Sequence, residues 1–266
     1  MGRLIAGDAL DVCRGLAPAC CDFIYCDPPF FTGVKRVNAH HGRHAFDDRW
    51  DSIEQFIDWL EARVQVMRAL LRPTGIFALH LDWHAVHYAK VMCDGVFGYE
   101  RFINEIIWCF RTGGASKRTL ARKHDTILVY GKSAGHAFYP QKEKSYLSHH
   151  YGFSNVEIHT DERGPYREAL MRDVWDIPAI RGNQPEATGY PTQKPMALVE
   201  RLLQCFTKEG DTVGDFFSGS GTTAVVAERM GRNFICGDVS LDALELAQSR
   251  TKTQPVIEAA DERSQL

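Results

Sequence analysis

Residues 21–31 read CDFIYCDPPFF, an apolar run that ends in residues able to do chemistry. Asp27 supplies a hydrogen-bond acceptor, and Phe30 supplies an aromatic face. Pro28 and Pro29 stiffen the backbone between them, because proline has a fixed φ and no N–H. Together these residues suit a planar ring with an exocyclic amino group, whose two protons would be donated to the Asp27 carboxylate and the Pro28 carbonyl. The alternative interpretation is a proline-rich loop that only covers the core.

Residues 215–230 read DFFSGSGTTAVVAERM, the pattern of a strand, a glycine-rich turn and a helix. Glycine lets the backbone turn tightly and lets a ligand approach it closely. The free N–H groups of the helix N-terminus suit an anionic group. An acidic residue about twenty positions past such a turn is expected to bond ribose hydroxyls, and Asp238 fits this place. We therefore expect a nucleotide-like ligand; a plain helix start is the alternative, since the loop is neither G-x-G-x-x-G nor a P-loop.

The elements that position these segments follow from the hydrophobic pattern. Apolar strands alternate with amphipathic helices, which predicts an α/β domain with a mainly parallel sheet. In such a sheet the ligand lies beyond the carboxyl ends of the strands, so the two segments are expected to share one rim. The expected strands are 21–27, 75–82, 102–110, 124–133, 212–217 and 233–240, and the expected helices are 51–72, 83–98, 191–206, 224–231 and one from about 241.

Composition limits the class of protein. The 266 residues suffice for one large domain with a sizeable core. Hydrophobic residues make up 44% and charged residues 24%, as in soluble globular proteins. No apolar run reaches the length of a membrane span, and the first ten residues lack the apolar core of a signal peptide. The eight cysteines form no C-x-x-C pair, so we expect reduced thiols, no metal site and a cytoplasmic protein.

Four segments together resemble the S-adenosylmethionine-dependent amino-methyltransferases of DNA. DPPF at 27–30 matches the catalytic motif D-P-P-[YF], and DFFSGSGTT at 215–223 matches the cofactor loop D-x-F-x-G-S-G-T-T. PTQKP at 191–195 lies just before that loop, and GDALDVCRGL at 7–16 resembles the segment that precedes the catalytic motif. The catalytic motif comes first, an order similar to that of the β group, which includes the type III modification methylases.

The resemblance covers nearly the whole chain and implies a fold. That fold is a Rossmann-like methyltransferase fold, with a mainly parallel twisted sheet, helices on both faces and a circularly permuted order of motifs. Residues 131–190 break the strand–helix rhythm and match nothing that names a target sequence. We expect residues 1–130 and 191–258 to form the methyltransferase domain, 131–190 to be a small inserted target-recognition and DNA-contact region, and 259–266 to be a tail.

The resemblance also assigns roles to residues. Asp27, Pro28, Pro29 and Phe30 would be catalytic. Asp238 would hold the cofactor's ribose and Asp8 would contact its adenine, whereas Lys194 either closes the pocket or is a solvated lysine at a helix start. The full set implied for S-adenosylmethionine is Asp8, Ala9, Asp27, Lys194, Pro195, Asp215, Phe216, Phe217, Ser218, Gly219, Ser220, Gly221, Thr222, Thr223, Asp238 and Val239.

The chemistry implied is direct in-line transfer of a methyl group to the N6 amino group of adenine in DNA. The target base would leave the helix stack and lie against Phe30. Neither a metal nor a covalent enzyme intermediate is needed. Three alternatives stay open: methylation of cytosine N4, a catalytically silent DNA-binding subunit, and a nucleotide-dependent oxidoreductase.

Double-stranded DNA as a partner has to be reconciled with a formal net charge of -3. Local basic stretches can bind phosphates despite that balance, although each residue is nearly as easily explained as part of a solvated loop. The resemblance further allows a homodimer and a restriction partner, and no membrane is expected. The residues predicted to contact DNA are Lys35, Arg36, Arg43, Arg111, Lys117, Arg118, Arg122 and Lys123.

Overall fold

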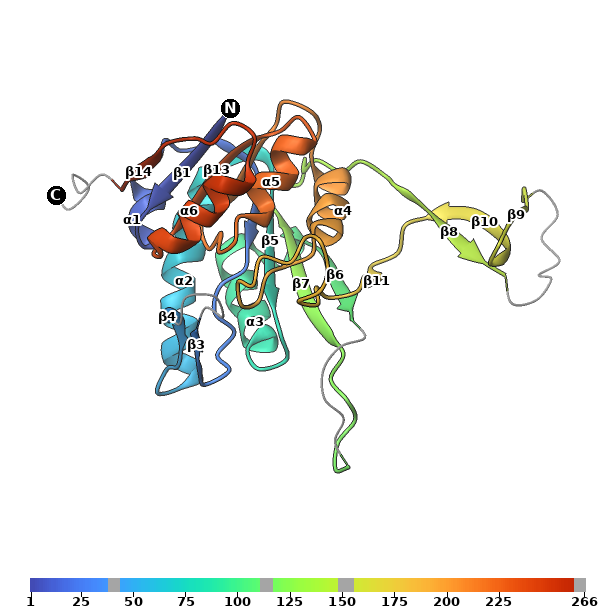
Figure 1. Ribbon diagram of the computed structural model, residues 1–266, viewed down its shortest axis with the longest axis horizontal. Coiled ribbons are helices and arrows are strands. Elements are labelled where there is room, and N and C mark those ends of the chain that lie inside the picture. Colours follow the sequence, from blue (N-terminus) through green and yellow to red (C-terminus); the bar gives the residue numbers. More distant parts are fainter. Residues whose placement is uncertain (38–43, 111–116, 148–155, 261–266) are drawn as a thin grey trace.

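A computed structural model describes residues 1–37, 44–110, 117–147 and 156–260, without the side chains of 35–37 and 44–47. Its centre is a nine-stranded sheet (Figure 1). The strands are β1 (Gly2–Ala6), β2 (Cys21–Cys26), β5 (Leu71–Leu81), β6 (Phe102–Cys109), β7 (His124–Gly131), β11 (Val174–Asp176), β12 (Thr212–Asp215), β13 (Asn233–Asp238) and β14 (Ile257–Ala259). Their order across the sheet is β11-β6-β7-β5-β2-β12-β13-β1-β14.

The direction of the strands brings the DPPF segment and the glycine loop to the same edge of the sheet. β7 pairs antiparallel with β5 and β6, and all other neighbours in this sheet are parallel. β2, which leads into the DPPF segment, lies directly beside β12, which leads into the glycine loop. The predicted mainly parallel sheet and the shared rim are therefore confirmed.

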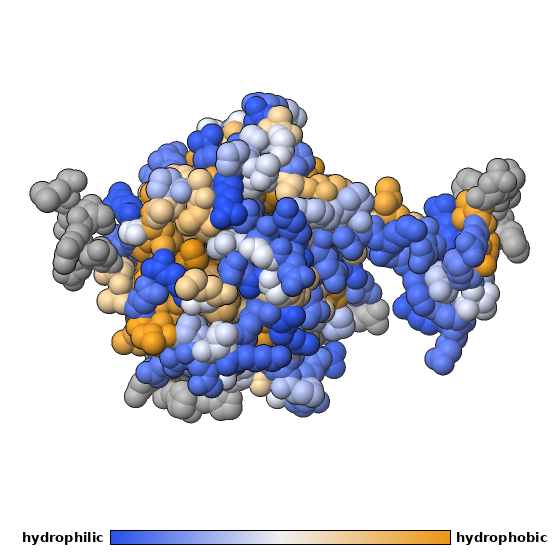
Figure 2. Space-filling view, turned by 90° about the horizontal axis from the view of Figure 1, so that it is seen from above, coloured by the Kyte–Doolittle hydropathy of each residue, from blue (hydrophilic) through white to orange (hydrophobic). Residues whose placement is uncertain are grey.

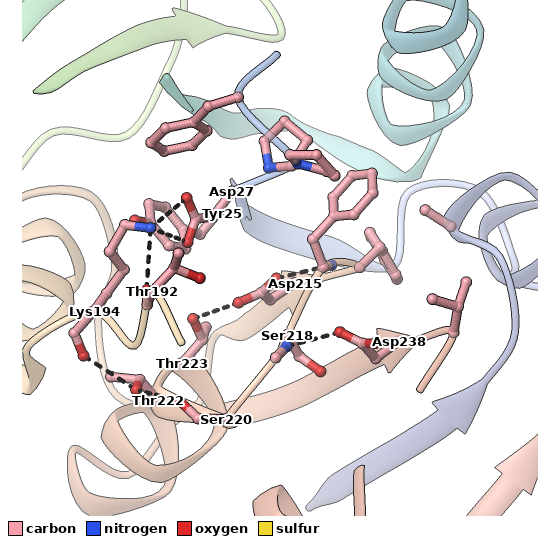
Figure 3. A pocket seen from close by; sticks show the side chains of 18 of the residues that line it. Tyr25, Asp27, Thr192, Lys194, Asp215, Ser218, Ser220, Thr222, Thr223 and Asp238 are labelled. Carbon is pink, nitrogen blue, oxygen red and sulfur yellow. Dashed lines mark hydrogen bonds and ion pairs between the residues drawn. The ribbon is translucent and has the colours of Figure 1, made fainter. Parts of the chain in front are cut away.

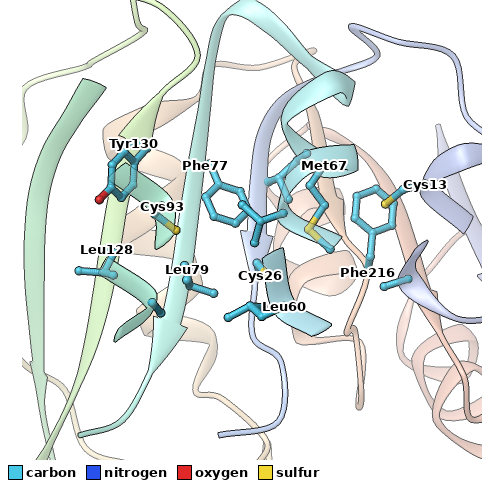
Figure 4. Close-up of a cluster of buried hydrophobic side chains, with 14 of the residues drawn as sticks. Cys13, Cys26, Leu60, Met67, Phe77, Leu79, Cys93, Leu128, Tyr130 and Phe216 are labelled. Carbon is cyan, nitrogen blue, oxygen red and sulfur yellow. The ribbon is translucent and has the colours of Figure 1, made fainter. Parts of the chain in front are cut away.

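Helices cover both faces of the sheet, as expected. On one face lie α1 (Ala9–Arg14), α2 (Ile53–Leu70) and α3 (Val86–Phe97), whose apolar sides join one buried cluster (Figure 4). On the other lie α4 (Met196–Phe206), α5 (Thr222–Arg229) and α6 (Leu241–Arg250), which pack in a second cluster. A short 3-10 helix, Tyr99–Arg101, follows α3. Burial of apolar surface on both faces is the main force that holds these layers together.

Helix boundaries differ from the expectation: α4 begins at Met196 rather than at 191, and α2 ends early. The pattern predicts a helix over 51–72 that stops at Pro73 and Gly75. In the structure Ser52 caps α2 by accepting a hydrogen bond from the Gln55 N–H at 3.2 Å, and the helix ends at Leu70. β5 starts at the next residue and contains both Pro73 and Gly75. The helix stops earlier because Leu71 already pairs with Cys21 of β2; after an irregularity the pairing continues from Ile76.

Two smaller sheets are attached to this body. One is a hairpin of β3 (Val34–Val37) and β4 (His44–Asp48). The other, called here the outer sheet, consists of β8 (Lys142–Tyr146), β10 (Gly164–Leu170) and β9 (His159–Asp161) in that order. The outer sheet projects away from the body, and its visible surface is largely hydrophilic (Figures 1 and 2). β11 also belongs to the predicted insert 131–190, yet it pairs with β6 in the central sheet.

Candidate functional site

A cavity of about 430 Å³ opens at the carboxyl edge of the central sheet. It is bounded by the segments that follow β2, β12 and β13, together with the chain just before α4 (Figure 3). Nearly all residues predicted for catalysis and cofactor binding line it; Pro195 and Gly221 do not. The predicted residues in the lining are Asp8, Ala9, Asp27, Pro28, Pro29, Phe30, Lys194, Asp215, Phe216, Phe217, Ser218, Gly219, Ser220, Thr222, Thr223, Asp238 and Val239.

Asp27 forms an ion pair with a lysine that is 167 positions away in the sequence. The Lys194 ammonium donates to both carboxylate oxygens of Asp27, at 2.7 and 2.6 Å (Figure 3). The same ammonium lies 4.9 Å from the centre of the Phe30 ring. Both charged side chains are mostly buried, 10% exposed for Lys194 and 16% for Asp27. The acceptor and the aromatic face expected from the sequence are thus side by side, and a basic residue lies between them.

The loop that follows DPPF is fixed by an acid that sequence reasoning missed. Phe31 has a φ of +64°, an uncommon conformation for a residue with a side chain. The buried Asp48 carboxylate, at the end of β4, accepts from the Phe31 N–H at 2.6 Å and from the Thr32 N–H at 3.1 Å, as well as from the Thr32 hydroxyl. These bonds hold Phe30 at the cavity wall. In the sequence Asp48 is one of two adjacent aspartates in FDDRWD, and nothing in that stretch singles it out for such a role.

The glycine loop has the shape of a cradle. Gly219 and Gly221 have positive φ values of +48° and +75°. A Cβ on Gly221 would lie 2.3 Å from the Cβ of Ala247 in α6, so only glycine fits there. The Asp238 carboxylate accepts from the Gly219 N–H at 2.8 Å and from the Ser240 N–H at 2.9 Å. Gly221 therefore shapes the loop from behind, and Asp238 faces the cavity with its carboxylate anchored.

Asp215 lies at the base of this cradle and is fully buried. Its carboxylate accepts from the Thr223 hydroxyl at 2.6 Å and from the Phe217 N–H at 3.1 Å. Burial raises the pKa of Asp215 to about 7, against the effect of these hydrogen bonds, and the nearby Asp27 and Asp238 add to the rise. Burial also raises the pKa of Asp238. This cluster of acids favours a ligand that carries positive charge.

Asp8, which also lines the cavity, forms a second ion pair there. It caps α1 and accepts from the Arg63 guanidinium at 2.8 and 2.9 Å. Arg63 in turn lies 4.1 Å from the centre of the Trp59 ring, and Trp59 lines the cavity beside Asp8. Trp59 also lies 5.8 Å from Phe217 of the glycine loop, ring centre to ring centre. These contacts form an aromatic wall next to Asp8.

Several other lining residues were not predicted, because aromatic and small polar residues far apart in the sequence give no common pattern. Tyr190 is the clearest example: a Cβ on Gly219 would lie 3.0 Å from its ring. Burial, with Asp238 and Asp27 nearby, raises its pKa. Tyr190 belongs to the predicted insert but lies in the chain that returns to the body after β11. The unpredicted lining residues are Tyr25, Thr32, Asp48, Trp50, Trp59, Tyr190, Thr192, Gln193 and Val199.

The residues predicted to contact DNA are only partly described. Lys117, Arg118 and Arg122 are exposed and Lys123 is half-buried, in the chain that enters β7 at the same edge of the sheet as the cavity. The Arg122 guanidinium lies 3.7 Å from the centre of the half-exposed Trp83 ring. Of the remaining set, Lys35 and Arg36 are in β3, where only the backbone is described, and Arg43 and Arg111 lie outside the described residues.

The cavity thus combines the acid-rich glycine loop with Asp27, which lies near the aromatic ring of Phe30. In the described part of the chain, no group of three or more His, Cys, Asp or Glu is arranged to hold a metal ion. The arrangement can bind a cationic, nucleoside-like molecule in the cradle and present a planar amine beside it. Such a site is suited to group transfer by positioning and electrostatics.

Comparison with known proteins agrees with this geometry. A family model described as DNA methylase (N6_N4_Mtase) matches residues 21–249. The type II methyltransferase M2.DpnII of Streptococcus pneumoniae is 29% identical over 259 residues, covering 94% of this chain and 90% of the relative. The DNA adenine methyltransferase YhdJ of Escherichia coli K12 is 25% identical over 254 residues, covering 93% and 81%. The structure of TTHA0409 from Thermus thermophilus, complexed with S-adenosyl-L-methionine, has a TM-score of 0.63 at 22% identity, covering 98% of this chain and 99% of that one.

Proposed function

Because this chain belongs to the N6/N4 DNA methylase family, we propose that it transfers a methyl group from S-adenosylmethionine to the N6 amino group of adenine in DNA. The observation that carries the proposal is the shared cavity in which Asp27 and Phe30 lie next to the glycine cradle. Adenine is chosen over cytosine because DPPF resembles the motif of adenine enzymes, and because the similar YhdJ is named a DNA adenine methyltransferase. Cytosine N4 stays the alternative target.

The cradle fits the proposed cofactor. Gly219 lines the cavity without a side chain, Gly221 keeps the turn close to Ala247 from behind, and Asp238 would accept from ribose hydroxyls. Asp215, at the base, would favour the positive charges of the methionine part. Asp8 and Trp59 would border the adenine. When bound, S-adenosylmethionine supplies an electrophilic methyl group.

The DPPF segment would prepare the amine for attack. The amino nitrogen of a base is a poor nucleophile because its lone pair is delocalised into the ring. Hydrogen bonds from the amine to the Asp27 carboxylate and the Pro28 carbonyl favour a more tetrahedral nitrogen, and Phe30 holds the ring by stacking. Lys194 now donates to both Asp27 oxygens, so the amine has to share or replace this contact.

The test is transfer of labelled methyl from S-adenosylmethionine to double-stranded DNA, followed by nucleoside analysis. We expect label in N6-methyladenine and at least a hundredfold loss of rate in Asp27→Ala, the scale of a lost electrostatic contact at a reacting group. Asp58→Ala, at an exposed position of α2, is the matched control and should keep full activity. Label in N4-methylcytosine would move the target to cytosine, and cofactor binding without any labelling of DNA would favour the silent subunit.

The assembly and the location of the protein are proposed on the resemblance. Within the described ranges, no helix is both long and apolar enough to cross a membrane. We expect the enzyme to act on double-stranded DNA in the cytoplasm, as a homodimer or with a restriction partner that cuts the same sequence. Sedimentation with and without DNA measures whether the protein is a homodimer. Protection of methylated DNA against a candidate nuclease measures the second.

A further inference from the structure

A buried histidine lies directly behind the proposed reaction site, and the transfer described above does not use it. His80, in β5, has no exposed surface. Its ring lies between Phe30 and Trp108, with ring centres 5.5 Å from each. A buried imidazole lowers stability unless its nitrogens have hydrogen-bond partners. The surroundings of both nitrogens therefore matter.

The two nitrogens of His80 face opposite acids. Nδ1 lies 2.5 Å from the Tyr25 hydroxyl and 3.9 Å from Oδ1 of Asp27. Nε2 has no well-aligned hydrogen bond, and it lies 3.4 Å from Oδ2 of Asp125. The ring therefore bridges the carboxylate at the reaction site and a second carboxylate, 15% exposed, at the start of β7.

In the described part of the chain, the charged groups next to the ring are Asp27 and Asp125. β2 and its loop contribute Tyr25 and Asp27, and β7 contributes Asp125. β6 contributes Trp108, which is uncharged and donates its indole N–H to the Ile177 carbonyl at 2.8 Å. Lys194 contacts Oδ1, the same carboxylate oxygen of Asp27, at 2.7 Å. The ring thus has a carboxylate near each of its two nitrogens.

The proposed reaction needs an exit for a proton. The amine nitrogen gains a bond to the methyl carbon while the carbon–sulfur bond breaks and its electron pair stays on sulfur. As positive charge develops on the nitrogen during this transfer, one N–H proton passes to an acceptor, so the nitrogen ends neutral. The first acceptor in reach is the Asp27 carboxylate, which lies in a mostly buried site. One proton must leave this site for every methyl group transferred.

We propose that His80 relays this proton from Asp27 to Asp125, an inference that rests on the proposed methyl transfer. Nδ1 takes the proton from Asp27 while Nε2 gives its own proton to Asp125, so the ring is neutral before and after. The relay requires the Tyr25 hydroxyl, 2.5 Å from Nδ1, to donate to that nitrogen before transfer, which leaves the ring proton on Nε2, and to turn and accept from the Nδ1–H afterwards. The 3.9 Å gap to Asp27 shortens in the complex, since catalytic hydrogen bonds are often long without substrate.

The first test is the single-turnover rate of methyl transfer, with the affinities for S-adenosylmethionine and DNA measured on the same samples. We expect His80→Gln to slow transfer about a hundredfold, the usual scale of general acid–base catalysis, with both affinities unchanged within twofold. Asp125→Asn, at a partly exposed position that tolerates an amide, should slow transfer in the same way. His87→Gln makes the same substitution at an exposed position of α3 and should keep the wild-type rate.

The second test determines the tautomer of the His80 ring without any catalytic turnover. The nitrogen NMR signals of His80, one of eleven histidines, are identified by their loss in His80→Gln. We expect the proton on Nε2 in the wild type. In Asp125→Asn the new amide can donate to Nε2, so the proton should move to Nδ1. The same tautomer in both proteins would overturn the relay.

The outcomes separate the two proposals. A wild-type enzyme that labels no DNA refutes the proposed function and the relay with it. An active wild type with an unimpaired His80→Gln variant overturns only the relay. A variant that loses affinity in parallel with rate would show that His80 is a packing residue, which also overturns it.

Discussion

At the scale of single residues, the buried Asp27–Lys194 ion pair is a site where substitution should strongly lower the free energy of unfolding. Both side chains are mostly buried, so removal of one leaves an uncompensated charge. We expect Asp27→Ala to lower the free energy of unfolding by about 3 kcal/mol, and Asp27→Ala/Lys194→Met to recover part of that loss. Urea unfolding measures both. The exposed pair Lys142–Glu168 is the control, and Glu168→Ala should change nothing measurable. Strict additivity of the two substitutions would contradict a coupled pair.

The acid at the base of the cradle predicts a pH dependence. The pKa of Asp215 is raised to about 7, so the carboxyl is mostly protonated at pH 6 and mostly ionised at pH 7.5. A cofactor with a sulfonium and an ammonium group prefers the ionised form. Its affinity should therefore rise, by roughly five- to tenfold over this interval. Calorimetry at the two pH values measures it. An equal slope in Asp215→Asn would assign the effect to another group.

Some of the site was predictable residue by residue, and the reason is local. Asp27 and Asp238 each end an apolar run, so a single stretch of sequence shows both the strand and the acid that the strand presents. Asp48 and Trp59 reach the cavity only through the fold. Their positions depend on how the β3–β4 hairpin and α2 pack, and no short stretch of sequence encodes that packing. The roles assigned to individual cofactor-binding residues stay predictions.

At the scale of elements, the contact between α5 and α6 decides whether the cradle forms. Gly221 has a φ of +75° and faces Ala247 so closely that a Cβ would overlap it. Gly221→Ala should cost roughly 1–2 kcal/mol for the backbone and roughly 1–3 kcal/mol for the overlap. Thermal unfolding measures the sum.

The matched variant separates these two costs. Gly210 has a φ of +86°, and no atom lies within 4 Å of the place that a Cβ would occupy, so Gly210→Ala should show the backbone cost alone. The double variant Gly221→Ala/Ala247→Gly should regain only part of the overlap cost, because the Cα of residue 247 would still lie 2.7 Å from the new Cβ. If Gly210→Ala and Gly221→Ala are equally unstable, packing against α6 contributes nothing.

Three strands of the central sheet were missed by the sequence pattern, and all three are short. β1, β11 and β14 have five, three and three residues and gain their stability from parallel neighbours rather than from their own alternation. β11 shows this well: Trp175 is buried and pairs with Trp108 of β6. A three-residue strand is too short for hydrophobic periodicity to be recognised in the sequence. The long strands and amphipathic helices were predictable because their patterns repeat.

At the scale of the whole molecule, the outer sheet can be removed without cutting the body. The Met171 N–H donates to the Gln141 carbonyl at 2.9 Å, so the chain enters and leaves the outer sheet at one point. Replacement of residues 142–170 by two glycines should leave cofactor affinity within twofold. We expect DNA affinity to fall at least tenfold, because this region is proposed to contact DNA. A fluorescence-anisotropy titration at fixed salt measures the change. Undiminished DNA affinity would move the DNA contacts to the body.

The order of strands has a consequence for how the protein is made. β1 and β2 are close in the chain, but β12 and β13 separate them in the sheet, and the ribosome synthesises those strands last. The ion pair at the site joins residues 167 positions apart. A nascent chain that ends before β12 leaves the inner edges of β1 and β2 unpaired, and long-range pairing of this kind folds slowly. We therefore expect no working fragment during translation, because Asp27 is among the first residues to emerge and the residues that enclose it belong to the last third of the chain.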